Sequence, residues 1–400
     1  MLLPMRADTR PSSELLPLVG RDSELAALRA LLDAAESGSG ATLFLAGEGG
    51  VGKSRLAAAL ADEAMRRGWT TAIGRAYPVE SGVPYAVFAD AMVPVLRALD
   101  DSALTLLTRG GSAELAALFP ALAPGDGRGR RAVAGDPAEL KTRLLWNFAQ
   151  LLARWSAKQP LLIVLENLQW ADSASLELMH FVARQLAPMR VVMLGTYNEL
   201  ERDQSAGLRP TEKSLVSLGA ATIWRLMPLS RAATDDLLRE AFGVDAAARE
   251  FAALLFGWTR GNPFFLEEVL TALVAQGRLY ERDGVWHGWD AGDLTLPSSI
   301  REALVARASL LSVHGRAVAD FAAVIGTRAS YDALRSVSEL APEALLAALD
   351  ELQRAHILSE GEAGSSVVFD FVHPMVRDAL YGELGLARVG QLHARVAESL

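Results

Sequence analysis

Residues 47–54 have the sequence Gly47-Glu48-Gly49-Gly50-Val51-Gly52-Lys53-Ser54, which fits the pattern G-x-x-x-x-G-K-[ST] at every constrained position. The apolar run over 41–46 before it is typical of a buried strand, and residues 55–64 after it favour a helix. A strand, a glycine-rich turn and a helix in this order predict a phosphate-binding loop. The context makes a chance glycine loop the weaker interpretation.

The chemistry of this loop comes from its backbone and from two side chains. Its glycines let several N–H groups point at one phosphate, and the helix N-terminus adds a partial positive charge. Lys53 is expected to reach the β- and γ-phosphates of a nucleotide, and the Ser54 hydroxyl to ligate Mg²⁺. The expected binding residues of this segment are Gly47, Gly49, Gly50, Val51, Gly52, Lys53, Ser54 and Arg55.

The composition of the whole chain limits the classes of function. Its 400 residues suggest two or three domains, and 51% hydrophobic residues supply a sizeable core. A net charge of −9 argues against a broad basic face for nucleic acid. Without cysteine, disulfides, thiolate metal sites and cysteine nucleophiles are excluded. We find neither a signal-peptide core nor a run of about 20 apolar residues, so we expect a cytoplasmic protein without a membrane partner.

Further strands are predicted along the first half of the chain, at 70–74, 161–165, 190–196 and 222–226. Helices are predicted between them, and this alternation indicates an α/β fold with a five-stranded parallel sheet. Helical segments and an alternating stretch at 367–372, paired with 357–359, then suggest a helical lid domain and a winged helix. The expected parts are a leader at 1–17, the P-loop domain at 18–227, the lid at 228–296, the winged helix at 297–385 and a helical region at 386–400.

The strongest predicted strand ends in an acid, within Glu166-Asn167-Leu168-Gln169-Trp170-Ala171-Asp172. ATP chemistry needs an acid near Mg²⁺ and a residue that orients the attacking water. Glu166 is able to hold the metal, directly or through water, although it could also be a plain carboxylate at a strand end. Asn167 cannot act as a base, because an amide does not accept a proton at neutral pH.

These features together resemble the STAND signal-transduction ATPases, and in particular the large ATP-binding regulators of the LuxR type and the ATPase modules attached to some bacterial cyclases. The resemblance covers about residues 18–400. It rests on the phosphate loop and on the segments Val19-Gly20-Arg21 with Glu24, 165–172, Gly195-Thr196-Tyr197-Asn198, 261–268 and 369–380.

The resemblance implies roles for residues outside the phosphate loop. Val19, Gly20 and Arg21 would lie near the adenine, and Pro263 would contact it. His373 would touch the β-phosphate of ADP in a closed state. Each has a plainer interpretation as well: Asn262-Pro263 suits a helix start, and a lone histidine is often a packed core residue.

Two positions depart from the family pattern. Asn167 stands where a second acid is usual, and Asn198 stands where the family's sensor strand, often Gly-Thr-Tyr-Arg, ends in arginine. Both changes remove groups that favour hydrolysis. We therefore expect a protein that binds ATP or ADP with Mg²⁺ and is at most a slow ATPase.

The resemblance also implies a switch whose output lies elsewhere. ADP would hold the winged helix closed, and ATP would favour an open form that self-associates. We expect the N-terminal part of a LuxR-type transcriptional regulator, truncated at about residue 400, with an unknown inducer and with DNA contacted only through a C-terminal module. The alternatives are the ATPase module of a signalling enzyme such as a nucleotidyl cyclase, and a self-standing P-loop enzyme.

Overall fold

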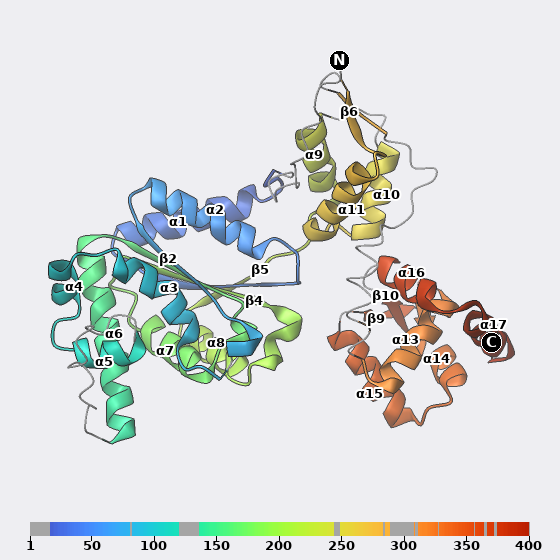
Figure 1. The fold of residues 1–400 in the computed structure, drawn as a ribbon. Helices are drawn as coiled ribbons and strands as arrows, with labels where there is room; N and C mark the ends of the chain where they lie inside the picture. Colours follow the sequence, from blue (N-terminus) through green and yellow to red (C-terminus); the bar gives the residue numbers. More distant parts are fainter. Residues whose placement is uncertain are drawn as a thin grey trace, which may run out of the picture. The chain divides into compact units, whose positions relative to one another are not determined.

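A computed structural model gives the fold of the chain (Figure 1). It describes residues 17–80, 82–119, 136–243, 249–282, 285–288, 308, 311–326, 328–355, 357–363, 366–371 and 374–399. Internal contacts divide the chain into two units. One is Arg21–Met227, and the other comprises the described residues up to Gly20 and from Pro228 onward.

The unit Arg21–Met227 is built around one sheet. Its strands are β1 (Ala41–Gly47), β2 (Thr70–Arg75), β3 (Leu161–Glu166), β4 (Val191–Asn198) and β5 (Thr222–Arg225). All neighbours are parallel, in the order β2-β3-β4-β1-β5. The predicted α/β class with a five-stranded parallel sheet is therefore confirmed. Because β4 separates β1 from β3, the end of β4 lies between the phosphate loop and the acid at the end of β3.

Helices cover both faces of this sheet. They are α1 (Asp22–Glu36), α2 (Lys53–Arg66), α3 (Ala86–Arg97), α4 (Asp101–Leu107), α5 (Ser112–Leu118), α6 (Pro137–Lys158), α7 (Ser173–Ala183) and α8 (Leu208–Ser217), with the short helices η1 (Pro78–Glu80), η3 (Leu168–Trp170) and η4 (Glu199–Gln204). Helices α1 and α2 lie on one face, and α3, α6, α7 and α8 lie on the other (Figure 1). The central strands are consequently buried on both faces, which explains their unbroken apolar runs.

A glycine sets the close packing of α3 on β2. A Cβ at Gly74 would lie 2.2 Å from the carbonyl oxygen of Val87, so only glycine allows this helix to approach the strand. The next residue, Arg75, is thereby fixed at the end of β2, directly opposite Glu166 in the strand register.

The second unit is mainly helical. Its elements are α9 (Arg231–Phe242), α10 (Arg249–Thr259), α11 (Pro263–Ala275), β6 (Tyr280–Arg282), β7 (Val285–His287), α13 (Val313–Ile325), β8 (Arg328–Ser330), α14 (Tyr331–Ser338), α15 (Pro342–Arg354), β9 (Leu358–Ala363), β10 (Ser366–Phe371), α16 (Pro374–Glu383) and α17 (Leu386–Ser399). The expected hairpin is present as β9 and β10, and β8 adds a third strand that the sequence pattern did not indicate.

Helix α17 packs onto this unit through both apolar and charged side chains. Leu392 and Val396 are buried in the same hydrophobic cluster as α13 and α14. Arg388 donates to the buried carboxylate of Asp320, and Arg395 donates to the carbonyl oxygen of Val337. The helix therefore shares the core of its unit.

Candidate phosphate-binding site

The loop between β1 and α2 has the backbone that its glycines predict. Gly47, Gly50 and Gly52 all have positive φ, at 154°, 82° and 103°. A Cβ at Gly47 would also lie 2.6 Å from the carbonyl oxygen of Leu226. The turn thus needs glycine at Gly47 for conformation and for space, and at Gly50 and Gly52 for conformation.

The side chain of Lys53 folds back into this loop. Its Nζ donates to the carbonyl oxygens of Gly47, at 2.8 Å, and Glu48, at 2.6 Å. Partial burial lowers the pKa of Lys53 to about 8, and the negative charges of Glu201, Glu48 and Glu199 offset this only in part. A phosphate in the loop would give the ammonium group the counter-charge that burial makes valuable.

Arg21 fastens the loop to the far end of the unit's chain. Its guanidinium is buried, and Nη2 donates to the carbonyl oxygens of Val51, at 3.1 Å, and Met227, at 2.7 Å. Nη1 donates to Glu24 at 3.0 Å. The structure therefore gives Arg21 a supporting role for the loop, which is compatible with the predicted position near an adenine.

The acid at the end of β3 is paired with an arginine. Glu166 Oε2 accepts from Arg75 Nε at 3.1 Å and from Nη2 at 2.6 Å. The Glu166 side chain is 5% exposed and the Arg75 side chain 49%, so the pair is buried on the carboxylate side. The spacing of apolar runs indicated Glu166 but gave no sign of its partner, which depends on strand order.

Two hydrogen-bond links join the ends of β3 and β4. The backbone N–H of Asn167 donates to Thr196 Oγ1 at 3.4 Å, and that of Asn198 donates to Gln169 Oε1 at 3.1 Å. The Nε2 group of Gln169 then donates to Glu201 at 3.3 Å. Asn167 itself has φ 61°, a conformation that asparagine tolerates better than most residues.

The remaining predicted residues lie at the start of α2 or in the second unit. Arg55 is half-buried on α2, and Ser54 is exposed on its first turn. Gly20 has φ 70°, and a Cβ there would lie 2.5 Å from the Cβ of Ala233, while Val19 packs in the same unit. Pro263 begins α11, where the Asn262 side chain accepts from the N–H of Phe264, so the local capping interpretation is confirmed. His373 lies outside the described residues.

Four further polar residues gather at this edge of the sheet. They are Arg75, Glu199 and Glu201, which lie outside the quoted motifs, and Gln169, which lies within the segment 165–172 but was given no role. The one available signal was their position just after predicted strands, since ligands of open α/β sheets bind beyond the carboxyl ends of strands.

The donor set suits Mg²⁺ held together with a phosphate. Ser54 and Glu166 offer a hydroxyl and a carboxylate, the hard oxygen ligands that Mg²⁺ prefers, and Mg²⁺ commonly takes only one or two protein ligands when a nucleotide is present. Among the residues that the structure describes, no group of three or more His, Cys, Asp or Glu forms an all-protein metal cage.

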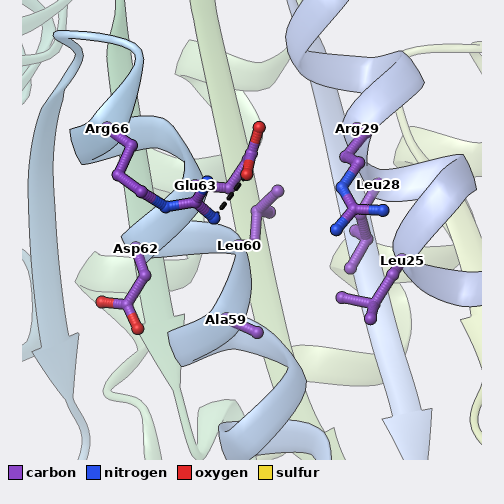
Figure 2. A pocket seen from close by; sticks show the side chains of 8 residues that line it. All are labelled: Leu25, Leu28, Arg29, Ala59, Leu60, Asp62, Glu63 and Arg66. Carbon is purple, nitrogen blue, oxygen red and sulfur yellow. Dashed lines mark ion pairs between the residues drawn. The ribbon is translucent and has the colours of Figure 1, made fainter. Parts of the chain in front are cut away.

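A groove in the same unit lies away from these residues. It has a volume of about 180 Å³ and lies between α1 and the C-terminal half of α2 (Figure 2). It is lined by Leu25, Leu28, Arg29, Ala59, Leu60, Asp62, Glu63 and Arg66. Arg66 and Glu63 form an ion pair at its rim. None of these residues belongs to the phosphate loop or to the ends of β3 and β4.

Residues 17–194 match the family described as the AAA ATPase domain. This range contains the phosphate loop, Arg75 and the end of β3. Residues 17–194 are thus similar to AAA-type ATPase domains. The match confirms a P-loop ATPase and agrees with the resemblance to the STAND class.

The chain is also similar to several individual proteins. An uncharacterized protein of Rhizobium meliloti (strain 1021) is 24% identical over 405 residues, 95% of this chain and 36% of the relative. The chain thus spans about a third of that relative's length. Among solved structures, Aeropyrum pernix ORC1 in complex with DNA has 16% identity and a TM-score of 0.45, covering 96% of this chain and 97% of the other.

A STAND protein with a tetratricopeptide repeat sensor from Pyrococcus horikoshii has 14% identity and a TM-score of 0.37. The similarity covers 98% of this chain and 47% of that protein. As for membranes, the helices within the described ranges are all too short or too polar to cross a bilayer.

Proposed function

We propose that this AAA-type domain is an ATP- and ADP-binding switch that hydrolyses ATP slowly. The observation that supports this most directly is the position of Lys53 inside a loop shaped by Gly47, Gly50 and Gly52. The ammonium group lies where it can pair with a bound phosphate. The N-terminus of α2 adds a partial positive charge at the same place. On nucleotide binding, Lys53 exchanges its two carbonyl partners for the β- and γ-phosphates.

Mg²⁺ would supply charge neutralisation on the phosphates when bound. Ser54 would ligate it directly, and Glu166 would hold it directly or through water. Thr196 is fully buried next to the end of β3. Its hydroxyl accepts a hydrogen bond from the N–H of Asn167 and so holds that backbone against β4. Arg21 maintains the loop by its bond to Val51.

Slow hydrolysis follows from the chemistry of two amides. Asn167 offers no proton acceptor where a second acid is usual, and Asn198 offers no positive charge where an arginine often stands. A well-placed general base contributes about 10²–10⁴-fold to rate, so the absence of a carboxylate at position 167 lowers turnover and leaves nucleotide binding intact.

The wider role is that of the nucleotide-binding part of a LuxR-type transcriptional regulator of the STAND class. In this proposal α9–α11 form the lid, with Pro263 against the adenine. The elements from α13 to β10, in the order helix, strand, helix, helix, strand, strand, form the winged helix. His373 would contact the β-phosphate of ADP, and ATP would favour an open, self-associating form. DNA would be contacted through a module beyond this chain.

Two other outputs remain as alternatives. The same domain could control a signalling enzyme such as a nucleotidyl cyclase, and cyclase activity of the native protein would distinguish this alternative. A self-standing P-loop enzyme is the weaker alternative, because it needs no second unit of the size seen from Pro228 onward.

The test is the nucleotide that freshly purified protein releases on denaturation, with ATP turnover measured on the same sample. We expect tightly held ADP or ATP and a turnover well below one per second, the low end of common enzyme rates. Lys53→Ala should abolish binding, and Lys213→Ala, an exposed lysine on α8, should not. An empty site with fast turnover would refute the switch.

A further inference from the structure

The short helix η4 brings a carboxylate to the tip of β3. It follows β4 without a loop and contacts η3 and β1, the strand that leads into the phosphate loop. Glu201 is its third residue, and its Oε2 accepts from Gln169 Nε2 at 3.3 Å. Since Gln169 also accepts from the N–H of Asn198, one amide side chain fixes Glu201 relative to both strand ends.

Glu201 differs from the other acids near this edge in its partners. Glu166 is paired with Arg75, and Glu199 is paired with Arg225 at 2.9 Å. Among the described residues, no cation forms an ion pair with Glu201, whose hydrogen-bond donor is a neutral amide. The guanidinium groups of Arg75 and Arg225 occupy oxygens of Glu166 and Glu199 with charged N–H donors, whereas Glu201 accepts from the uncharged amide of Gln169.

The position of Glu201 is also electrostatically linked to the loop. Its negative charge acts on Lys53, more strongly than the charges of Glu48 or Glu199 do. Lys53 and Glu201 are therefore close enough to interact electrostatically, although they are not an ion pair. A carboxylate near the phosphate-binding lysine repels the phosphates and therefore weakens nucleotide binding. A residue that opposes binding in this way suggests a separate function at the site.

We infer that Glu201 is the base that accepts a proton from the attacking water, in place of the acid missing at Asn167. This rests on the proposed nucleotide-binding function. The water oxygen forms a bond to the γ-phosphorus, and the bond from that phosphorus to the bridging oxygen of ADP breaks. The water proton passes to Glu201 and then to solvent, which leaves ADP and inorganic phosphate.

The inference predicts opposite effects on binding and on chemistry. Glu201→Gln retains an oxygen that accepts from Gln169, but it removes both the base and the negative charge. Hydrolysis of bound ATP should therefore fall by on the order of a hundredfold. Affinity for a non-hydrolysable ATP analogue should stay the same or increase, because the charge opposing the phosphates is gone.

The experiment uses the full chain and three variants. Single-turnover hydrolysis, the ratio of ATP to ADP retained by the protein, and analogue affinity are measured for wild type, Glu201→Gln, Glu201→Asp and Asp203→Asn. Asp203 is an exposed acid of the same η4 helix, so its variant removes an equal charge outside the site. We expect Glu201→Gln to retain ATP, Glu201→Asp to keep intermediate turnover, and Asp203→Asn to match wild type.

The outcomes separate this inference from the proposed function. Undiminished hydrolysis in Glu201→Gln, or bound ATP that wild type never cleaves, would overturn the role of Glu201 while leaving the switch in place. Failure of wild type to bind nucleotide would refute both. Should Glu201→Gln not fold, Glu201→Asp decides: hydrolysis equal to wild type with a displaced carboxylate would contradict a base at this position.

Discussion

Arg75 donates two hydrogen bonds to a single carboxylate oxygen of Glu166, from Nε at 3.1 Å and from Nη2 at 2.6 Å. The two residues are 91 positions apart in the chain and meet because β2 and β3 are neighbours. The second oxygen, Oε1, is not engaged by Arg75. Glu166 is thus held in one orientation while the positive charge of Arg75 competes with any cation that it would ligate.

Arg75→Ala should lower the stability of the protein, and binding of Mg²⁺ with nucleotide should restore part of the loss. Removing the guanidinium leaves a buried carboxylate without its partner, so the free energy of unfolding should fall by about 1–2 kcal/mol. This loss is smaller than for a fully buried ion pair, because Arg75 is half exposed. Mg²⁺ at Glu166 restores a counter-charge. Denaturant unfolding with and without Mg·ATP measures this. Arg29→Ala, an exposed arginine on α1, should show no such Mg²⁺-dependent recovery.

Gly52→Ala and Gly68→Ala form a matched pair. Both glycines have positive φ, 103° and 81°, and a Cβ at either would meet no neighbour within 4 Å. Each alanine should cost about 1–2 kcal/mol of stability through backbone strain alone. Only Gly52→Ala should also weaken nucleotide affinity, because it distorts the start of α2. Equal affinity of the two variants in a nucleotide titration would show that the conformation of Gly52 does not matter for binding.

Arg21→Ala should loosen the phosphate loop. The buried guanidinium bonds the carbonyl oxygens of Val51 and Met227, and their loss should lower stability by about 2–3 kcal/mol. Nucleotide affinity should fall roughly tenfold, corresponding to about 1.4 kcal/mol. Arg21→Lys keeps the charge but lacks the planar fork, so it should recover little. Arg66→Ala, at an exposed position on α2, serves as the control for both measurements.

Asn167→Asp should raise the rate of ATP hydrolysis by roughly tenfold or more, because it supplies a carboxylate at the tip of β3. Aspartate tolerates the φ of 61° found there, so the backbone should not change. Asn167→Gly keeps that backbone and provides no side chain, and its turnover should stay at the wild-type level or below it. A rate for Asn167→Asp equal to that of Asn167→Gly would contradict the assignment of slow turnover to this position.

Patterns within short segments were sufficient to predict the strands of the unit Arg21–Met227. The apolar runs at 41–46, 161–165 and 190–196 became buried strands because a covered parallel sheet needs residues that are apolar on both faces. The loop pattern correctly indicated the glycines with positive φ, since no other residue adopts that backbone cheaply. In the second unit the alternation over 367–372 predicted β10, but nothing nearby indicated β8, which is three residues long.

The sequence by itself determined the phosphate loop, the strands and the acid at Glu166, because each depends on residues adjacent in the chain. Tertiary structure alone decided the order β2-β3-β4-β1-β5, and with it the partners of those residues. Arg75 beside Glu166, Arg21 bridging Val51 and Met227, and Glu201 bonded to Gln169 all join residues brought together by packing. Strand order is fixed by burial summed over the whole sheet, so no local pattern encodes it.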